Sequence, residues 1–267
     1  MTGAPKRIVS RDNRGWRECV ALAGSARERR RQQRTLLEGI HLCQAWLQWR
    51  GGFETLIVSD AALDDAEVGA LLRAPATRTW HVTDSLFGEL SQLEHGIGVA
   101  AIVPTPVTDW PARIDDDCVY LDRLQDPGNV GTILRTCAAV GIGRVALAPG
   151  SAACWSPKVL RAGMGAHFAL RIHEGVSWAA LRAACALTAT ATALHDARPL
   201  FATDLRAPRV WVFGNEGAGV DPAILADGVQ RVAIPQQPGI ESLNVSSAAA
   251  VCLYEQWRQR GDQRPDG

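Results

Sequence analysis

Three segments of this chain combine glycine with polar residue types that bind anions or cofactors. They are Asp126-Pro-Gly-Asn-Val-Gly131 followed by Arg135, Phe213-Gly-Asn-Glu-Gly-Ala-Gly219, and Ile234-Pro-Gln-Gln-Pro-Gly-Ile-Glu-Ser-Leu-Asn-Val-Ser246. Each is typical of a strand that runs into a turn. Glycine lets the backbone approach a ligand closely, and a helix start offers unpaired N–H donors to an anion. Three such turns predict one composite site.

The first segment leads into a helix whose apolar residues have helical spacing, so Arg135 projects away from the buried face. Near a helix start its guanidinium would lie beside backbone N–H donors, which favours an anion such as a phosphate. An ordinary surface arginine is the alternative. The neighbouring Asn129 and two glycines favour the functional interpretation.

The other two segments each carry candidate site residues. Glu216 follows the apolar strand pattern Val210 to Phe213, where a carboxylate can orient a cation or a donor, or can serve as a helix N-cap partner. Ser242 or Asn244 can cap the alanine-rich helix that follows, whose small residues would allow another backbone to pack closely. Both interpretations of the third segment can hold together.

Several familiar catalytic signatures are missing from the sequence. It contains no P-loop, no H-E-x-x-H and no G-x-S-x-G. Gly214, Gly217 and Gly219 have the reverse of the dinucleotide-binding spacing. The six histidines are dispersed, so we predict no metal site.

Composition indicates an ordinary globular protein with a local excess of positive charge. The 267 residues are 47% hydrophobic with a net charge of zero, and the seven scattered cysteines form no C-x-x-C pair. Together with an N-terminus that lacks an apolar signal region, this predicts reduced thiols in the core and a cytoplasmic location. Residues 1–50 hold eleven Lys or Arg against four Asp or Glu. A solvated helix face or an RNA-binding surface would explain the densest run, which comprises Arg27, Arg29, Arg30, Arg31 and Arg34.

The chain divides into two α/β units at a proline-rich linker. We predict a small unit over 1–103, a linker over 104–117, a second unit over 118–258 and a disordered tail over 259–267. In the first unit, Leu36 to Trp49 is predicted to be helical after the arginine run, and strands are expected at Thr55 to Val58 and Thr79 to Val82. In the second, strand and helix patterns alternate, which favours a largely parallel sheet with ligands at the carboxyl ends of its strands.

The elements predicted in the second unit begin and end as follows. Strands are expected at Cys118 to Leu124, Arg144 to Ala148, Phe168 to Ile172, Thr188 to Leu194, Val210 to Phe213 and Val229 to Ile234. Helices are expected at Val130 to Val140, Pro157 to Gly163, Trp178 to Leu187 and Leu243 to Arg258.

These three motifs, in this order, resemble the SpoU (TrmH-like) branch of the SPOUT RNA methyltransferases, which methylate ribose 2′-hydroxyls with S-adenosylmethionine. The resemblance covers residues 118 to 258. Residues 1–103, with Leu36-Leu-Glu-Gly-Ile40 at the expected helix start, look like an L30e-like substrate-binding domain.

The resemblance implies a deep trefoil knot in a parallel-sheet SPOUT domain, and a homodimer with the Leu243 to Arg258 helix near its interface. Gln236 departs from the family, in which many members carry an apolar residue, often Met. The implied cofactor-binding residues are Gly214, Asn215, Gly217, Ile234 and Leu243. The implied catalytic residues are Asn129, Arg135, Glu216, Ser242 and Asn244.

The family's motif-one arginine has been proposed as a general base, but arginine stays protonated in proteins. Our hypothesis is that Arg135 binds a phosphate and stabilises the developing alkoxide. The two-domain organisation favours ribosomal RNA over tRNA as substrate. A non-catalytic RNA-binding protein and a small-molecule enzyme on a nucleotide-binding fold are the alternatives.

Overall fold

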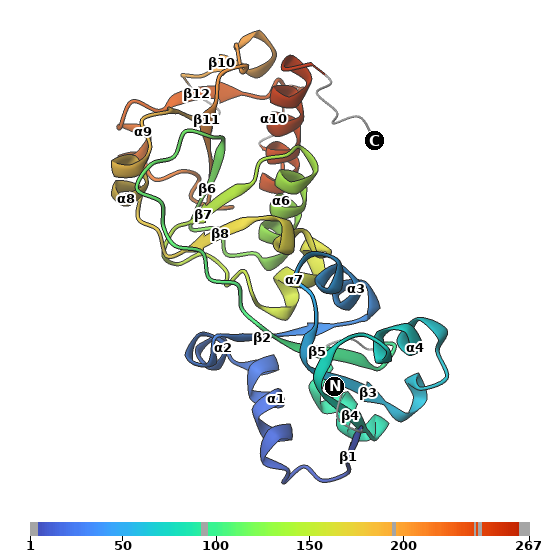
Figure 1. The fold of residues 1–267 in the computed structure, drawn as a ribbon. Helices are drawn as coiled ribbons and strands as arrows, with labels where there is room; N and C mark the ends of the chain where they lie inside the picture. Colours follow the sequence, from blue (N-terminus) through green and yellow to red (C-terminus); the bar gives the residue numbers. More distant parts are fainter. Residues whose placement is uncertain (1–4, 92–95, 194–195, 238, 240–241, 262–267) are drawn as a thin grey trace. The chain divides into compact units, whose positions relative to one another are not determined.

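The computed structural model describes residues 5–91, 96–193, 196–237, 239 and 242–261. It forms two compact units (Figure 1). Unit 1 contains residues 1–107 and 155–168, and unit 2 contains residues 108–154 and 169–267.

Unit 1 is built on a five-stranded sheet in the order β1-β4-β3-β5-β2. β3 pairs in parallel with β4, whereas β5 runs antiparallel to both β3 and β2. The elements are β1 (Lys6–Ile8), α1 (Arg14–Gly24), α2 (Ala26–Gln32), β2 (Arg34–Glu38), α3 (Ile40–Trp49), β3 (Phe53–Ser59), η1 (Asp60–Ala62), α4 (Ala66–Leu72), β4 (Ala76–Val82), α5 (Asp84–Leu90), β5 (Val99–Pro104), α7 (Pro157–Gly163) and η2 (Ala166–Ala169).

The predicted helix from Leu36 to Trp49 is wrong at its start. Leu36 and Leu37 lie in β2, where they pair with β5 and are fully buried. Gly39 has a φ of 96°, outside the helical region, so α3 begins only at Ile40. Four arginines of the run, Arg27, Arg29, Arg30 and Arg31, lie in α2, whereas Arg34 is the first residue of β2. The two predicted strands are confirmed as parts of β3 and β4.

A segment from the middle of the chain completes unit 1. The Thr35 hydroxyl donates to the Trp155 carbonyl at 2.8 Å, and Arg161 lies 3.5 Å from the buried Glu38 carboxylate. The rings of Trp46 and Phe168 pack edge to face with centroids 5.3 Å apart. This segment falls inside the predicted second unit, 118–258, whereas its contacts cluster with unit 1.

Unit 2 is a seven-stranded parallel sheet in the order β10-β12-β9-β11-β6-β7-β8. α6 and α10 pack side by side on one face, and α8 and α9 lie on the other (Figure 1). Its elements are β6 (Cys118–Asp122), α6 (Pro127–Ala139), β7 (Arg144–Leu147), β8 (Arg171–Glu174), α8 (Trp178–Ala184), β9 (Thr188–Thr192), β10 (Arg198–Pro199), η3 (Leu200–Ala202), β11 (Arg209–Gly214), α9 (Pro222–Leu225), β12 (Gln230–Ala233) and α10 (Val245–Gln259).

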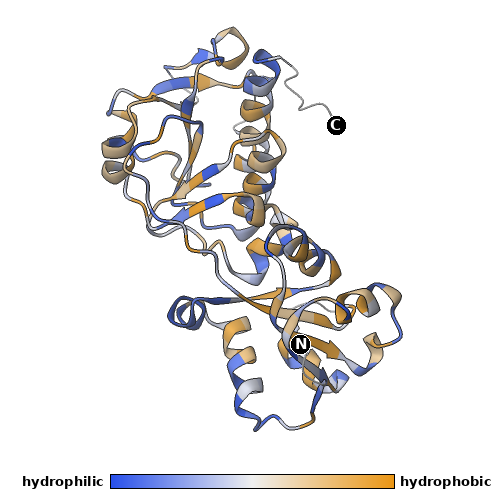
Figure 2. Ribbon diagram, viewed as in Figure 1, coloured by the Kyte–Doolittle hydropathy of each residue, from blue (hydrophilic) through white to orange (hydrophobic). Residues whose placement is uncertain are grey.

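The core of unit 2 follows from its hydropathy pattern. Figure 2 shows hydrophobic residues along the central strands and mixed residues along the covering helices. On α6, Val130, Ile133, Leu134 and Cys137 are buried while Arg135 is exposed. The predicted orientation of this helix is therefore confirmed. A helix with one apolar stripe buries that stripe against the sheet.

Two predicted boundaries in unit 2 are corrected. β8 begins at Arg171, because residues 166–169 form the 3₁₀-helix η2 instead of a strand. The predicted tail is wrong at its start, since α10 extends to Gln259 and Arg260 forms an ion pair with Asp117. The rest of the predicted tail, residues 262–267, lies outside the described residues.

All seven cysteines are buried, which agrees with their predicted place in the core. Burial raises the pKa of the Cys43 and Cys252 thiols to about 12, so both stay protonated and unreactive at neutral pH. No helix among the described residues is long and apolar enough to cross a membrane.

Candidate functional site

The three motifs meet at the carboxyl edge of the unit 2 sheet. β6 and β11 are parallel neighbours that end in register, with Gly214 opposite Asp122. The first motif continues into α6, where the Asp126 side chain caps the helix by accepting from the Asn129 amide at 2.7 Å. The third motif continues into α10, which Asn244 caps. Because α6 and α10 pack side by side, Asn129 and Asn244 come together.

A chain of side-chain hydrogen bonds joins the three motifs. Asn244 donates its Nδ2 to Asn129 Oδ1 at 2.9 Å, and Asn129 donates its Nδ2 to Glu216 Oε1 at 3.1 Å. The Asn244 Oδ1 accepts from the backbone amide of Ser246 at 2.9 Å, which fixes the orientation of its carboxamide. The predicted composite site therefore does bring Asn129, Glu216 and Asn244 together.

Glu216 is held as a carboxylate. Its oxygens also accept from the backbone amides of Gln125 and Asp126, at 3.3 and 3.2 Å. Desolvation raises the pKa of the Glu216 carboxyl, but the hydrogen bonds from Asn129 and from backbone amides outweigh it, so the pKa lies below its ordinary value. At neutral pH this side chain is an acceptor and carries no proton to donate.

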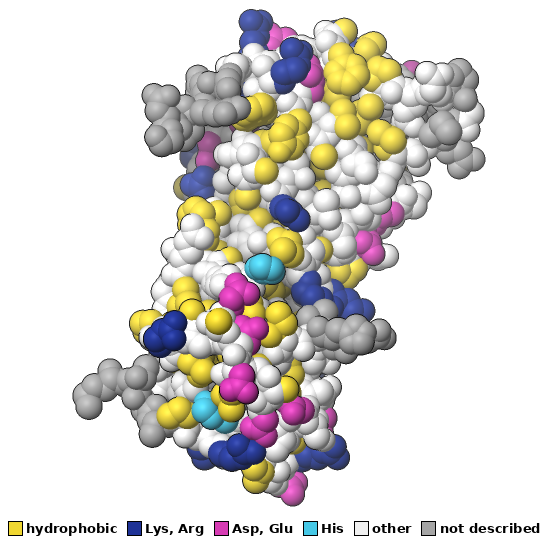
Figure 3. Space-filling view, turned by 90° about the vertical axis from the view of Figure 1, so that its right-hand side faces the viewer, with side chains coloured by type: hydrophobic (Ala, Val, Ile, Leu, Met, Phe, Trp, Pro, Cys, Tyr) yellow, Lys and Arg dark blue, Asp and Glu magenta, His cyan; other side chains and the backbone are white. Residues whose placement is uncertain are grey.

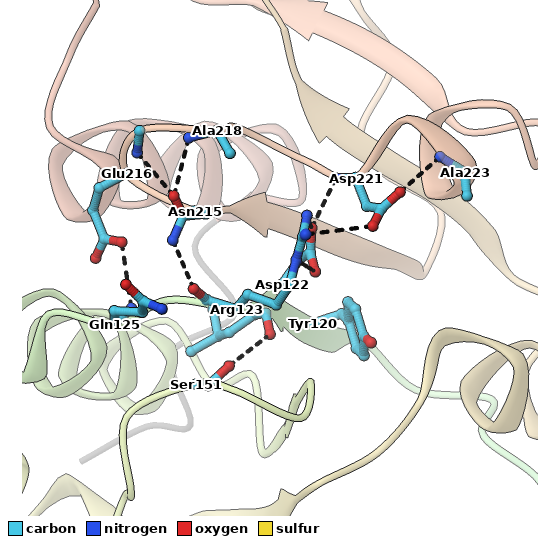
Figure 4. A network of polar contacts seen from close by, with 12 residues as sticks. Tyr120, Asp122, Arg123, Gln125, Ser151, Asn215, Glu216, Ala218, Asp221 and Ala223 are labelled. Carbon is cyan, nitrogen blue, oxygen red and sulfur yellow. Dashed lines mark hydrogen bonds and ion pairs between the residues drawn. The ribbon is translucent and has the colours of Figure 1, made fainter.

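The turn that carries Glu216 is itself held in place by the residue that follows β6. Asn215 Oδ1 accepts from the amides of Gly217 and Ala218, both at 3.0 Å, and Asn215 Nδ2 donates to the Arg123 carbonyl at 2.9 Å. Figure 4 shows Asn215 pointing toward Arg123, with Glu216 beside Gln125. Asn215 thus fixes the turn through its own side chain.

Sequence reasoning missed the residue beneath this turn, Asp122. Its buried carboxylate accepts from the Asp221 amide at 2.8 Å and binds the Arg123 guanidinium at 2.9 and 3.0 Å (Figure 4). Arg123 has a φ of 56°, a conformation that costs energy for a residue other than glycine. The sequence pattern that could have indicated this role is an aspartate at the end of an apolar strand.

A cavity of about 560 Å³ opens beside the hydrogen-bond chain, a size typical of small-molecule sites. All five predicted cofactor-binding residues line it, as do Glu216, Ser242 and Asn244. Gly214 has no room for a side chain, since a Cβ there would lie 2.2 Å from the Val220 nitrogen. The complete lining is Thr192, Ala193, Gly214, Asn215, Glu216, Gly217, Gly219, Val220, Ile234, Gln236, Ser242, Leu243, Asn244, Val245 and Ala248.

Arg135 and Ser242 remain outside the hydrogen-bond chain. Arg135 is exposed on α6 and makes no side-chain hydrogen bond or ion pair within the described residues, so its guanidinium is available to an external anion. Ser242 is exposed at the cavity.

The five arginines predicted to bind RNA, four on α2 and Arg34 on β2, divide into side chains with protein partners and side chains without them. Arg29 is buried and donates to the Leu22 and Ala23 carbonyls at 2.7 and 3.1 Å, which satisfies the end of α1. Arg31 pairs with Glu28, and Arg34 pairs with Glu54. Arg27 and Arg30 are exposed and carry no hydrogen bond or ion pair of their side chains in the described part of the chain.

A parallel sheet with a polar cavity at its carboxyl edge is the architecture of a ligand-binding α/β domain, and comparisons with known proteins show which class of α/β protein this is. Residues 117–254 match the SpoU rRNA Methylase family. An uncharacterized tRNA/rRNA methyltransferase from Synechocystis is 34% identical over 241 residues, which are 87% of this chain and 86% of that protein. The 23S rRNA (uridine(2479)-2′-O)-methyltransferase from Streptomyces viridochromogenes is 30% identical over 271 residues, covering 97% and 94%.

A solved structure extends the match to the fold. The SpoU methyltransferase AviRb from Streptomyces viridochromogenes, in complex with the cofactor AdoMet, superposes with a TM-score of 0.82 at 28% identity, covering 94% of this chain and 100% of that one. This chain therefore belongs to the SpoU rRNA methylase family of S-adenosylmethionine-dependent RNA methyltransferases. The resemblance noted in the sequence is confirmed.

The cavity fits S-adenosylmethionine. Its lining combines apolar side chains, such as Ile234 and Leu243, with glycine backbone and a few polar groups, the combination that small-molecule sites use to bury a ligand and fix its orientation. Among the described residues no cluster of His, Cys, Asp or Glu could hold a metal ion.

Proposed function

We propose that this enzyme methylates a ribose 2′-hydroxyl of ribosomal RNA. The observation that carries the proposal is the hydrogen-bond chain from Asn244 through Asn129 to Glu216, at the edge of the cavity. The relative from Streptomyces viridochromogenes, which is named for 2′-O-methylation of 23S rRNA, supports the choice of RNA. We propose the cytoplasm as its location.

The catalytic roles follow from charge and position. Bound S-adenosylmethionine supplies a sulfonium-activated methyl group. Arg135, exposed and protonated, binds the phosphate next to the target ribose and stabilises the alkoxide that develops on its oxygen. Glu216 and Asn129 orient the reacting groups, because each is fixed by hydrogen bonds from other motifs. Ser242 contacts the bound molecules at the mouth of the cavity.

The cofactor is held by the motif loops. Gly214, Asn215 and Gly217 contribute closely approaching backbone, while Ile234 and Leu243 cover the apolar part of S-adenosylmethionine. Support comes from the cavity, which all five residues line. We also propose that the chain forms the trefoil knot that the family resemblance implies.

We propose a homodimer that buries the outer face of α10. Tyr254 and Trp257 on this helix are 48% and 36% exposed, and Figure 3 shows hydrophobic side chains gathered on a face of unit 2. Exposed apolar patches of this kind mark interaction surfaces, and a twofold dimer pairs the same patch on both copies. Equilibrium sedimentation that finds only a monomer would contradict this arrangement.

We propose that unit 1 is an L30e-like domain that binds structured rRNA through phosphates. Its exposed Arg27 and Arg30 carry the positive charge for such contacts, because neither is paired with a carboxylate in the described residues. Arginine suits this role since its guanidinium binds phosphate oxygens in pairs. tRNA is the alternative substrate.

Methyl transfer from labelled S-adenosylmethionine to total RNA, taken from a strain that lacks this protein, tests the proposal. We expect label in one rRNA species as an alkali-resistant 2′-O-methyl nucleotide, with loss of labelling in Asn129→Ala and Glu216→Ala. Gln125→Ala is the matched control, because only the backbone of Gln125 bonds to Glu216. Labelling of tRNA would favour the alternative substrate. Absence of both labelling and cofactor binding would overturn the proposal.

A further inference from the structure

Arg123 has a backbone conformation that its residue type does not favour. Its φ of 56° lies in the left-handed region, which costs energy for residues other than glycine. Two of the other described non-glycine residues with a positive φ, Gln33 and Met164, end helices, where this conformation is common. A further one, Asp196, is of a type that tolerates it. Arg123 instead directly follows β6, so neither reason applies to it.

The side chain of Arg123 holds this conformation in place. Its guanidinium bonds to both carboxylate oxygens of the buried Asp122, at 2.9 and 3.0 Å, and lies 3.5 Å from the Asp221 carboxylate (Figure 4). A strained residue persists only where its surroundings hold it, and such residues cluster at functional sites. The two ion pairs therefore offset the cost of the left-handed backbone.

The backbone after Arg123 contacts the turn that carries Glu216. The Arg123 carbonyl accepts from Asn215 Nδ2 at 2.9 Å, and the amides of Gln125 and Asp126 donate to the Glu216 carboxylate. The carbonyl and the residues after it rotate with the φ of Arg123. A change to an ordinary φ would therefore turn the carbonyl away from Asn215 and move the two amides that hold Glu216.

We propose that Arg123 is a positioning residue whose left-handed backbone places the turn from Asn215 to Gly219 for cofactor binding and for catalysis. Asn215, Glu216 and Gly217 line the cavity, whereas Arg123 does not, so it acts through the turn. This proposal rests on the proposed function and adds a residue that sets the geometry of its site.

Calorimetric binding of S-adenosylhomocysteine to Arg123→Ala and Arg123→Gly tests this role. Both variants lose the guanidinium, but only glycine adopts a positive φ without a steric cost. We expect Arg123→Ala to weaken binding by about five- to thirtyfold, which corresponds to the cost of the left-handed conformation when nothing offsets it. Arg123→Gly should bind within about threefold of the wild type, because its backbone keeps the conformation.

The matched controls are Gln33→Ala and Gln33→Gly. Gln33 also has a positive φ, of 53°, but it belongs to unit 1. These two variants should differ from each other in stability to urea and should both keep the wild-type affinity for S-adenosylhomocysteine. Arg123→Asn is a second rescue variant, because asparagine tolerates the left-handed region, and it should bind like Arg123→Gly.

Single-turnover methyl transfer at saturating cofactor and RNA gives a second readout. Since Glu216 moves with the turn, Arg123→Ala should lower this rate and Arg123→Gly should restore it. Equal losses in the alanine and glycine variants would overturn the assignment, because they would show that the guanidinium acts directly. Wild-type cofactor affinity in Arg123→Ala would overturn it as well. Failure of the wild type itself to bind S-adenosylhomocysteine would instead overturn the proposed function.

Discussion

The motif loops of unit 2 and helix α2 of unit 1 both carry polar residues that suggest RNA chemistry, yet they are organised differently. In the loops, Asn129, Glu216 and Asn244 come from distant parts of the sequence and bond directly to one another. In α2, Arg29 and Arg31 bond to groups within a few residues of the chain.

This difference shows how much each kind of sequence pattern can predict about the contacts that its residues make. A carboxamide that both accepts and donates has one fixed orientation, so Asn129 can serve only where two partners are placed for it. A guanidinium has five donors and finds acceptors in many surroundings. An arginine run therefore predicts positive charge well, but it does not distinguish Arg29, which stabilises α1, from the exposed Arg30.

Substitution of Arg135, the one predicted catalytic arginine, should have the largest effect, and this effect is on the rate of methyl transfer. Arg135→Ala should lower the rate of methyl transfer by about a hundred- to a thousandfold, because one charged donor to the developing alkoxide is lost. Arg135→Lys should retain part of the rate, since it keeps the charge. Complete loss of activity in Arg135→Lys, with RNA and cofactor still bound, would argue against charge stabilisation. Single-turnover kinetics provide the measurement.

Asp122 tests whether the motif loops depend on a buried support. Asp122→Ala should lower the free energy of unfolding by about 1–3 kcal/mol, because the Asp221 amide and the Arg123 guanidinium lose their buried acceptor. Asp115→Ala removes only an exposed ion pair with Arg113 and should change stability by less than about 1 kcal/mol. Equal midpoints of urea unfolding for the two variants would contradict the prediction that Asp122 stabilises the motif loops.

Within α2, substitution of Arg29 should affect the stability of the protein, whereas substitution of Arg30 should affect RNA binding. Arg29→Ala should destabilise the protein by about 1–3 kcal/mol, since it leaves the Leu22 and Ala23 carbonyls without their donor. Arg30→Ala should leave stability within about 0.5 kcal/mol and reduce the salt dependence of RNA affinity by about one unit of slope. The prediction that α2 contacts RNA would be wrong if Arg30→Ala left that slope unchanged.

The smallest effect should be a pH dependence that Glu216 confers on stability. Hydrogen bonding lowers the pKa of the folded carboxyl below that of the unfolded chain. Its contribution to stability is therefore fully present above the ordinary glutamate pKa of about 4.3 and is lost as the pH falls through the lower folded value. The difference in urea midpoint between wild type and Glu216→Gln should shrink over this acidic range. A difference independent of pH would contradict the assignment.

Much of unit 2 could be predicted from the sequence because its local signals agree. Apolar runs mark the buried parallel strands, Asp126 and Asn244 are standard helix caps, and glycine at 214 is required by the close approach of Val220. The composite site followed from the rule that ligands bind at the carboxyl ends of parallel strands.

Other features depend on partners that the sequence does not place. Leu36 and Leu37 have the spacing of a helix, but pairing with β5 makes them a strand. The long-range contacts of Thr35 with Trp155 could not be read from either segment alone.

The discontinuous make-up of unit 1 constrains how this protein can exchange parts with its relatives. Replacing residues 1–107 by a single recombination event would leave Arg161 and Phe168 of one parent against Glu38 and Trp46 of the other. Both contacts are made by residues on β2 or α3 with a segment encoded after β7. The two stretches of unit 1 must therefore be exchanged together if these contacts are to be kept.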